Sequence, residues 1–314
     1  MAKYLVTGGA GFIGSNLARH VLAQGHQAIV LDNLATGKRE NMDDFAGQAT
    51  FIEGDIRDRS AVDRAVAGTT AIFHEAALPS VPRSVEDPAS SHDVNVNGTL
   101  TLLDAARAAG VRRVVFAASS SAYGERAESP KHEGMVPMPI SPYAASKVAC
   151  ECYLRAYAAA YGMETVSLRY FNVFGPYQDP EGAYSAVIPA FVSRLLRGQK
   201  PVVYGDGEQS RDFCYIDNVC QANWLAAHAP AEACDGTVVN IACGARTTLN
   251  EILRLLAELL NTDVQADYAD PRPGDVKHSM ADVSLAKKVI GYEPKVFFAD
   301  GLRNAIDWYK ANLT

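Results

Sequence analysis

The chain has 314 residues, of which 48% are hydrophobic and 21% are charged, and its formal net charge is −7. These values are typical of an ordinary soluble globular protein, and the length favours two lobes around a cleft. The negative charge is spread along the chain, which gives no support to binding of nucleic acid or of an anionic membrane. No apolar run approaches the roughly 20 residues that a membrane span needs. The first residues lead into a predicted strand rather than a signal peptide, so we expect a cytoplasmic protein.

The six cysteines do not have the spacing of zinc ligands. Cys150 and Cys152 lie two residues apart on a predicted helix and therefore point to different faces. The others are Cys214, Cys220, Cys234 and Cys243. The seven histidines do not cluster as ligands either. We therefore expect buried free thiols in a reducing compartment and no bound metal.

The N-terminal segment has the pattern of a nucleotide-binding unit. Lys3–Thr7 is a short apolar run typical of a strand, and a glycine turn, Gly8–Gly14, follows it. Ser15–Gln24 has helical periodicity, and a second apolar run, Gln27–Leu31, ends at Asp32. Strand, glycine turn, helix, strand and acid in this order predict the mononucleotide-binding half of a doubly wound sheet.

The glycines of the turn are required for physical reasons. A side chain at Gly8 or Gly11 would obstruct the turn and keep backbone amides away from a pyrophosphate, and Gly14 lets the helix pack on the strand. The N-terminus of that helix then faces the phosphates. Asp32 suits the ribose diol of NAD and would repel the 2′-phosphate of NADP. The alternative is a glycine-rich turn with an aspartate on the surface.

Strands and helices alternate beyond Asp32, which predicts a parallel sheet covered on both faces, an α/β Rossmann-type doubly wound fold. The predicted strands are Thr50–Ile52, Ala71–His74, Arg113–Ala118, Glu164–Tyr170 and Val238–Ile241. The predicted helices are Ser60–Val66, Asp93–Ala109, Pro142–Tyr161 and Val219–Ala227. Ligands bind such sheets beyond the carboxyl ends of the strands, where Asp55-Ile56 and the small residues Ala76 and Ala77 would converge. We expect His74 to pack at its strand end rather than to act in catalysis.

The alternation is lost after Phe174. There we expect a helix at Ser185–Arg197, a strand at Pro201–Tyr204, and helices at Leu249–Leu260 and Ala299–Lys310. These elements predict a smaller α/β substrate lobe. Its expected boundaries are 175–218 and 244–314, and those of the nucleotide-binding domain are 1–174 and 219–243.

Tyr143 and Lys147 are four residues apart on a predicted helix and therefore share one face. A nearby cation favours a phenolate, and lowering a tyrosine pKa from ~10 to about 7 requires roughly 4 kcal/mol. A second cation beside Lys147 is therefore needed to lower the tyrosine pKa this far, and an oxidised nicotinamide ring would be one. Alone, the pair is a weak signal, because such pairs arise by chance on many exposed helices.

The glycine spacing Gly-x-x-Gly-x-x-Gly and Tyr143-x-x-x-Lys147 together resemble the extended short-chain dehydrogenase/reductase superfamily. Over essentially its whole length the chain is similar to the UDP-hexose 4-epimerases, most of all to the branch that acts on N-acetylated sugars. The further matching segments are Ser80–Ser84, Phe116–Gly124, Tyr170–Gly175, Gln178-Asp-Pro, Gly207–Asp217 and Arg272–Asp275. Relatives of this kind form homodimers through a four-helix bundle, which implies an interface at 93–109 and 142–161.

The resemblance implies a cofactor, NAD, and a UDP-sugar substrate. The expected NAD-binding residues are Gly8, Gly11, Phe12, Ile13, Gly14, Asp32, Asn33, Thr36, Gly37, Asp55, Ile56, Ala76, Ala77, Asn95, Ala117, Tyr143, Lys147, Tyr170 and Val173. The expected substrate-binding residues are Ser80, Ser119, Ser120, Ser121, Tyr143, Asn172, Gln178, Ala186, Val187, Tyr204, Arg211, Arg272, Asp275 and Ser279. Asn95 could instead hold the sheet together beneath the cofactor.

The implied mechanism uses Ser119, Tyr143 and Lys147. Tyr143 would remove the proton of the sugar 4-hydroxyl, Lys147 would lower the tyrosine pKa, and Ser119 would bond the 4-oxygen. A 4-keto sugar would turn over and be reduced from its other face. Nucleotide-sugar dehydratases carry Thr-Asp-Glu where this chain has three serines, so dehydration is disfavoured.

One position bears on substrate size. Relatives restricted to glucose and galactose place a tyrosine where this chain has Ser279, so the resemblance implies room for an N-acetyl group. UDP-glucuronate 4-epimerisation, net oxidation or reduction of a nucleotide sugar, and a non-catalytic NAD-binding role remain as alternatives. Retention of Ser119, Tyr143 and Lys147 together argues against the last one.

Overall fold

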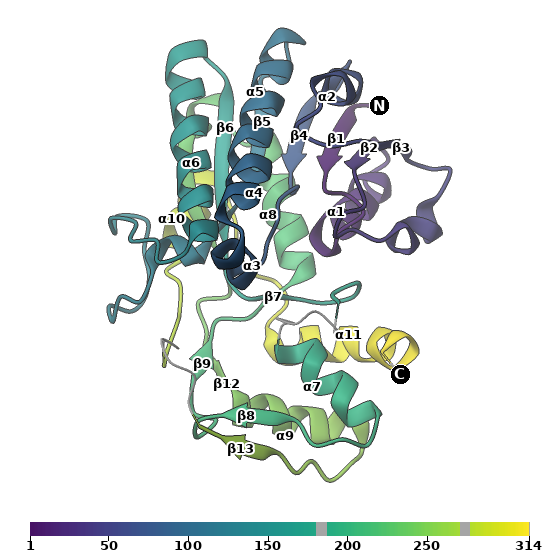
Figure 1. Ribbon diagram of the computed structural model, residues 1–314, viewed down its shortest axis with the longest axis vertical. Helices are drawn as coiled ribbons and strands as arrows, with labels where there is room; N and C mark the ends of the chain where they lie inside the picture. The colour runs from purple at the N-terminus through teal and green to yellow at the C-terminus, as the bar shows by residue number, and fades with distance from the viewer. Residues whose placement is uncertain (180–186, 271–276, 314) are drawn as a thin grey trace.

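Seven parallel strands form the central sheet of the computed structural model, which describes residues 1–179, 187–270 and 277–313 (Figure 1). Their order in the sheet is β3-β2-β1-β4-β5-β6-β11. The strands are β1 (Lys3–Thr7), β2 (Gln27–Asp32), β3 (Thr50–Glu53), β4 (Ala71–His74), β5 (Arg113–Ser119), β6 (Glu164–Tyr170) and β11 (Asp235–Ile241). The chain reverses its direction of winding between β1 and β4, where such sheets bind ligands. The predicted doubly wound α/β fold is confirmed.

Helices cover both faces of this sheet because alternate strand residues point to opposite sides. Val6 packs in the cluster that contains α1 (Phe12–Ala23) and α8 (Ile216–His228). Its neighbour Leu5 packs in the cluster of the opposite face. The helices of that face are α2 (Arg59–Val66), α5 (Gly98–Ala108) and α6 (Pro142–Tyr161).

The ends of helix α6 are fixed by local sequence. The Ser141 hydroxyl accepts a hydrogen bond from the Ala144 amide, Pro142 occupies the first turn, and Gly162 ends the helix in the left-handed conformation with φ 65°. These are the cap residues that a helix of this kind requires. The bounds of α6 are those predicted from the sequence, so Tyr143 lies in its first turn.

A smaller region lies beyond the carboxyl ends of the central strands, at the bottom of Figure 1. Its longer elements are α7 (Val187–Leu196), α9 (Leu249–Leu260) and α11 (Phe298–Asn312). Three short strand pairs accompany them: β7 (Val173–Phe174) with β10 (Cys214–Tyr215), β8 (Val202–Tyr204) with β13 (Asp267–Ala269), and β9 (Ser210–Arg211) with β12 (Thr247–Thr248). Between these segments the chain returns to the main sheet as α8 and β11. The lobe boundaries themselves stay a prediction.

Several elements differ from the sequence-based expectation. The predicted helix 93–109 begins with a π-helical turn, Asp93–Asn97, and α8 begins three residues earlier than expected, at Ile216. Strand β11 also begins earlier, because a shift of register at Asp235 and Thr237 interrupts its apolar pattern. Short helices were not predicted, since too few residues define their periodicity. They are α3 (Val81–Glu86), α4 (Pro88–His92), α10 (Ser284–Ile290) and the 3-10 helices Arg39–Phe45, Ser120–Tyr123 and Ala231–Ala233.

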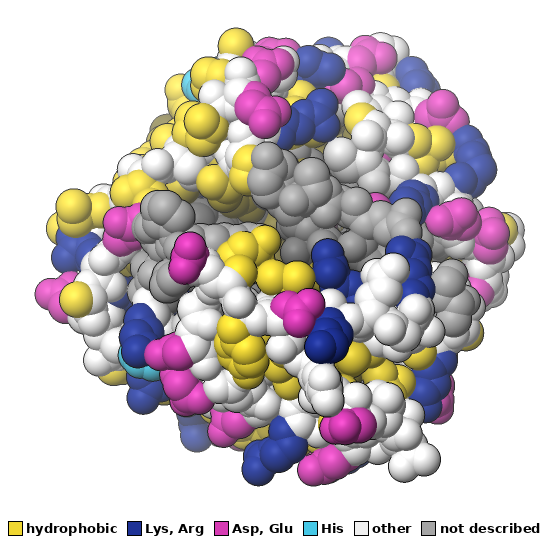
Figure 2. All heavy atoms as spheres, turned by 60° about the horizontal axis from the view of Figure 1, so that its bottom comes forward, with side chains coloured by type: hydrophobic (Ala, Val, Ile, Leu, Met, Phe, Trp, Pro, Cys, Tyr) yellow, Lys and Arg dark blue, Asp and Glu magenta, His cyan; other side chains and the backbone are white. Residues whose placement is uncertain are grey.

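All six cysteines are free thiols, and five of them are buried. The prediction of buried thiols is wrong for Cys152, which lies on the exposed side of α6. No helix within the described ranges is long and apolar enough to cross a membrane. Among the same residues, no group of three His, Cys, Asp or Glu side chains could hold a metal ion. Acidic and basic side chains are intermixed over the face shown in Figure 2.

A buried ion pair joins helix α6 to the sheet. The Arg169 guanidinium donates to both carboxylate oxygens of Glu151, at 2.9 and 2.8 Å, and the two side chains are 4% and 6% exposed. The guanidinium also lies over the ring of Tyr123, 4.7 Å from its centroid. The pair ties the middle of α6 to β6, one turn beyond Lys147.

We predict that Glu151→Ala destabilises the protein by about 3–5 kcal/mol, because it leaves the Arg169 charge buried without a partner. Urea denaturation followed by circular dichroism would measure the loss. The matched control is Asp63→Ala, which breaks the exposed Arg59–Asp63 pair at 2.7 Å and should cost less than about 1 kcal/mol. Equal losses in the two variants would contradict the role given to the buried pair.

Candidate active site

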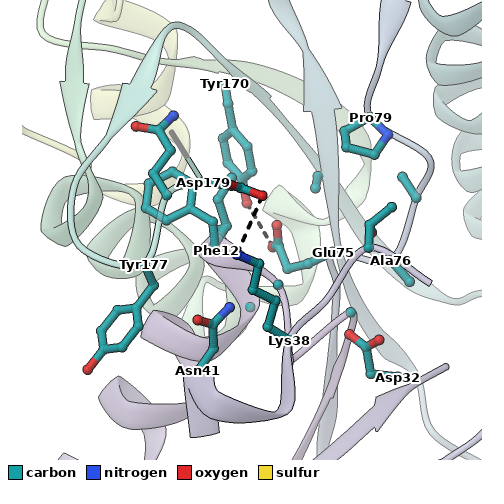
Figure 3. A pocket seen from close by; sticks show the side chains of 18 of the residues that line it. Phe12, Asp32, Lys38, Asn41, Glu75, Ala76, Pro79, Tyr170, Tyr177 and Asp179 are labelled. Atoms are coloured by element: carbon teal, nitrogen blue, oxygen red, sulfur yellow. Dashed lines mark hydrogen bonds and ion pairs between the residues drawn. The ribbon is translucent and has the colours of Figure 1, made fainter. Parts of the chain in front are cut away.

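A cavity of about 740 Å³ opens beyond the carboxyl ends of the central strands (Figure 3). Its size lies within the range usual for small-molecule sites. Thirteen of the residues predicted to bind NAD line it: Gly8, Gly11, Phe12, Ile13, Gly14, Asp32, Thr36, Ala76, Ala77, Ala117, Tyr143, Lys147 and Tyr170. The structure therefore gathers residues from β1, β2, β4, β5, β6, α1 and α6 around one space.

The glycine turn leaves one side of the cavity without side chains. A Cβ atom at Gly8 would lie 2.8 Å from the backbone of Ala76, and Gly8 has a φ of 69°. A Cβ at Gly14 would collide with the Gly8 carbonyl oxygen. No side chain of the described residues caps α1 at Gly11, so its first amides are free to bind an anion. This cradle fits the pyrophosphate of a dinucleotide.

Asp32 is held at the end of β2 by backbone amides. Its Oδ2 accepts a hydrogen bond from Ala10 N at 3.0 Å, and its Oδ1 accepts one from Leu34 N at 2.8 Å. Burial raises the pKa of Asp32, although these two bonds act in the opposite direction. Each carboxylate oxygen keeps a lone pair that can accept from a ribose hydroxyl. This arrangement suits the adenosine ribose of NAD.

Four of the remaining predicted NAD residues lie behind this end of the cavity. Asn33 donates to Asp55 Oδ2 at 2.8 Å. Arg57 donates to both oxygens of Asp55, and these hydrogen bonds hold the pKa of that carboxyl well below its usual range. Ile56 is buried in the core, and Gly37 packs against Asp32. Their side chains position the loops rather than line the cavity.

Asn95 and His74 are buried in a polar cluster beneath the cavity. The Asn95 carboxamide accepts from Leu78 N at 2.8 Å and donates to Ser146 Oγ at 3.0 Å. His74 bonds Thr7 Oγ1 and Thr99 Oγ1, and burial lowers its pKa to about 3. Asn95 therefore connects the loop after β4 to α6, and His74 packs within its strand end; whether Asn95 also contacts NAD stays a prediction.

Tyr143 and Lys147 line the cavity from the first two turns of α6. The Lys147 ammonium lies 6.0 Å from the centroid of the Tyr143 ring and donates to the Ala117 carbonyl oxygen at 2.8 Å. The Tyr143 amide donates to Ser84 Oγ at 3.0 Å, which fixes the start of the helix against α3. A cation thus stands beside the phenol, as the spacing predicted.

Ser119 ends β5 two residues beyond Ala117, where Lys147 is bonded. Its Oγ accepts hydrogen bonds from Ser121 Oγ at 2.8 Å and from Ser121 N at 3.2 Å. Because both bonds are received, the Ser119 hydroxyl proton stays available to donate to another oxygen. The loop after Ser119 offers only the hydroxyls of Ser120 and Ser121 and no carboxyl group.

Glu75 is a residue of the cavity that sequence reasoning missed. Its Oε1 accepts a hydrogen bond from the Tyr170 hydroxyl at 2.9 Å, and that hydroxyl accepts one from Asn223 Nδ2 at 2.7 Å (Figure 3). Burial raises the pKa of Glu75 to about 7. A charged residue directly after the apolar strand Ala71–His74 is the signal that could have found it.

Three predicted substrate residues, Asn172, Arg211 and Ser279, come together along the segment 210–212. Asn172 donates to the Asp212 carbonyl oxygen at 3.1 Å, and Ser279 N donates to the Ser210 carbonyl oxygen at 3.1 Å. Arg211, next to Ser210, and Tyr204, at the end of β8, belong to the same stretch of chain. Ala186, Arg272 and Asp275 lie outside the described residues.

Asp212 binds the backbone of the neighbouring loops through its carboxylate. It was not among the residues predicted from the sequence. Its carboxylate, wholly buried, accepts from the amides of Cys243 at 2.9 Å, Gly244 at 3.0 Å and Ala281 at 3.1 Å. Burial raises its pKa to about 6. One side chain thereby holds two loops, at 243–244 and at Ala281, beside Arg211.

The other predicted residues take different positions. Gln178 lines the cofactor cavity and donates to the Val173 carbonyl oxygen at 3.1 Å. Val173 itself pairs in β7, Ser80 caps α3, and Val187 begins α7. Whether these residues contact substrate stays a prediction.

Comparison with known proteins matches residues 4–242 to the family described as NAD dependent epimerase/dehydratase. The UDP-glucose 4-epimerase of Thermotoga maritima, solved with UDP-glucose, is 39% identical, with a TM-score of 0.92 over 99% of this chain and 100% of that one. The UDP-N-acetylglucosamine 4-epimerase of Methanobrevibacter ruminantium, in complex with UDP-N-acetylmuramic acid, is also 39% identical, with a TM-score of 0.93 over 99% and 98%. The UDP-glucose 4-epimerase of Thermus thermophilus, in complex with NAD, is 40% identical, with a TM-score of 0.88 over 99% of each chain.

The family agrees with the chemistry of the cavity. A glycine cradle for a pyrophosphate, an aspartate for a ribose and a tyrosine beside a lysine are what an NAD-dependent oxidation of a hydroxyl requires. The predicted cofactor, NAD, is confirmed by the family. This chain belongs to the NAD dependent epimerase/dehydratase family.

Proposed function

We propose that this protein is a UDP-hexose 4-epimerase. The observation that carries the proposal is that Tyr143 and Lys147 line one dinucleotide-sized cavity, with Lys147 bonded to Ala117 of the strand that ends at Ser119, before a loop without carboxyl groups. Such a site can remove the proton of one hydroxyl group and the hydride on the same carbon atom, and can later return both. The similar epimerases described above support the UDP-sugar as substrate.

Each of the three residues has a task in the reaction. Tyr143, as phenolate, takes the proton of the sugar 4-hydroxyl, and the Lys147 ammonium beside it favours that charged form. Ser119 donates its free proton to the 4-oxygen while a ketone forms. The glycine turn and Asp32 would hold NAD, which would supply an acceptor for the hydride of carbon 4 and a donor for its return. The ketone turns between the two transfers, so the stereocentre at carbon 4 is inverted.

Dehydration is the other activity within the family. Elimination of water needs a further acid and base next to the catalytic hydroxyl. The residues in that position are Ser120 and Ser121, whose hydroxyls are poor acids and bases at neutral pH. The loop therefore favours epimerisation over dehydration.

A cofactor that is reduced and reoxidised within one turnover must stay bound. The segment 176–179 lines the cavity with three of its residues and contacts α1. Asn16 Nδ2 donates to the Pro176 carbonyl oxygen at 3.1 Å, and the Arg19 guanidinium lies 3.8 Å from the centroid of the Tyr177 ring. Lys38 and Asp179, which both line the cavity, form an ion pair at 3.6 Å (Figure 3). These contacts support retention of NAD.

We predict that Tyr177→Ala increases the rate of NAD loss about tenfold, because a cation–π contact is worth about 1 kcal/mol and the ring also packs on Trp308. The bound NAD per protein chain, measured after extensive dialysis, would show the loss. Tyr161→Ala is the matched control, since Tyr161 also lies under an arginine but far from the cavity. Equal retention in Tyr177→Ala and the wild type would refute a role for the segment in retaining NAD.

The best test of the activity uses the purified protein without added cofactor. We expect it to interconvert UDP-glucose with UDP-galactose or UDP-GlcNAc with UDP-GalNAc, as seen by NMR at carbon 4.

Tyr143→Phe should lower the rate of this interconversion by at least about a hundredfold, since general acid–base groups contribute roughly 10²–10⁴-fold. Conversion of UDP-glucuronate alone, or release of free NADH, would support the alternative functions instead.

We further propose that the enzyme accepts N-acetylated UDP-hexoses. Ser279 is small and only partly exposed, and its amide is fixed to Ser210, beside Arg211. A small side chain there leaves room for a substituent on carbon 2 of the sugar. The similar UDP-N-acetylglucosamine 4-epimerase agrees with this choice.

Ser279→Tyr should abolish turnover of UDP-GlcNAc and spare that of UDP-glucose, because the larger ring would fill the space for the acetyl group. Rates with both substrates, compared in one preparation, would measure the change in specificity. Ser279→Ala provides the control and should keep both activities. If Ser279→Tyr lowers both rates equally, Ser279 does not set the size of the sugar pocket.

A further inference from the structure

Glu75 is a carboxyl group in the cofactor cavity for which the proposed reaction has no use. It follows directly after β4, and its side chain faces Tyr170 rather than the surface (Figure 3). The Tyr170 hydroxyl donates to Glu75 Oε1 at 2.9 Å, and Asn223 fixes that hydroxyl from α8 at 2.7 Å. Three elements thus hold one carboxylate in a defined position.

Within the described part of the chain, this carboxylate forms no ion pair, and Lys147 acts on it only through its charge from farther away. Burial raises the pKa of Glu75 to about 7 in spite of Lys147 and the bond from Tyr170. A carboxyl group in such surroundings takes up a proton unless a positive charge lies beside it. A cation bound in the cavity would therefore favour the charged form of Glu75.

The position of Glu75 indicates which charge this is. Asp32 marks the adenosine end of the cavity, whereas Tyr143 and Lys147 mark the end where the hydroxyl is oxidised. Tyr170, the last residue of β6, is bonded to Glu75 and lines the cavity together with Tyr143 and Lys147. The cation that belongs at this end is the oxidised nicotinamide ring.

We propose that Glu75 is the counter-charge of the oxidised cofactor and sets its reduction potential. The inference rests on the proposed function. When the sugar is oxidised, the hydride of carbon 4 passes with two electrons to NAD⁺, and the hydroxyl proton passes to Tyr143. The ring then loses its positive charge, and Glu75 loses its partner. The carboxylate therefore favours return of the hydride and keeps the ketone short-lived.

A purely structural role makes a different prediction. If Glu75 only anchors Tyr170, a glutamine in its place could accept the same hydrogen bond and nothing else would change. Glu75→Gln removes the charge and keeps the shape. Glu75→Asp keeps the charge on a shorter side chain and is the matched control.

The test measures the reduction potential of the bound cofactor in the NAD-loaded protein, by equilibration with a redox dye and without sugar. Glu75→Gln should shift the ratio of reduced to oxidised cofactor about tenfold towards NADH, because a charge a few ångströms away is removed from a weakly screened site. Glu75→Asp should stay close to the wild type. An unchanged ratio in Glu75→Gln, or equal shifts in both variants, would overturn the proposal.

The pH dependence provides a second readout. Groups that face Glu75 are Tyr143 and Lys147 on α6, Tyr170 on β6 and Cys220 on α8. These groups are present in both the wild type and Glu75→Gln. The difference between the two proteins in the ratio of reduced to oxidised cofactor therefore reports on Glu75 alone. The difference in this ratio should be largest well above pH 7 and should be lost as the pH falls through about 7 and the carboxyl becomes protonated. A difference that persists unchanged to pH 5 would contradict a charge effect.

Failure of the Glu75 proposal can be told apart from failure of the proposed function. A wild-type protein that binds NAD but fails to epimerise any UDP-hexose would end the proposed function, and the dye titration would still test Glu75. With active protein, saturating UDP-hexose should leave more bound NADH in Glu75→Gln, seen by its near-ultraviolet absorbance. Equal NADH levels in active wild type and Glu75→Gln would again count against the proposal.

Discussion

The hydrogen bond from the Lys147 ammonium to the Ala117 carbonyl oxygen joins helix α6 to the end of β5, and the chemistry of the site depends on this junction. It sets the lysine beside the Tyr143 ring, two residues before the end of β5 at Ser119. The buried pair of Glu151 and Arg169 holds the next turns of the helix against the sheet. A helix free to slide along the sheet would lose the alignment of phenol, ammonium and hydroxyl together.

Charge is distributed along the cavity in a way that matches a dinucleotide. The N-terminus of α1 offers the positive end of its dipole to a pyrophosphate, and Asp32 offers lone pairs to a ribose. At the end where Tyr143 and Lys147 lie, we propose that the ammonium favours the phenolate and that Glu75 favours a cation. Oxidation of the sugar would neutralise both the ring and the phenolate, and Glu75 acts on the first of these two changes by favouring the oxidised ring.

Much of this arrangement could be predicted from the sequence, because it depends on local patterns. The glycine turn and the four-residue spacing of Tyr143 and Lys147 each define their geometry within one or two elements. The relay from Asn223 through Tyr170 to Glu75 could not be predicted, since it joins three segments far apart in the chain. The same holds for Asp212, whose role depends on loops that only the fold brings together. The sugar pocket and the homodimer stay predictions, the former because Ala186, Arg272 and Asp275 lie outside the described residues.

The central claim is that hydride leaves carbon 4 of a UDP-hexose and returns to the same carbon from a cofactor that never leaves the protein. The most direct measurement follows a UDP-hexose that carries deuterium at carbon 4, with NMR of the product. The account predicts an inverted stereocentre that keeps its deuterium at carbon 4, without release of labelled NADH. Deuterium found at carbon 6, in free NADH or lost to solvent would contradict it.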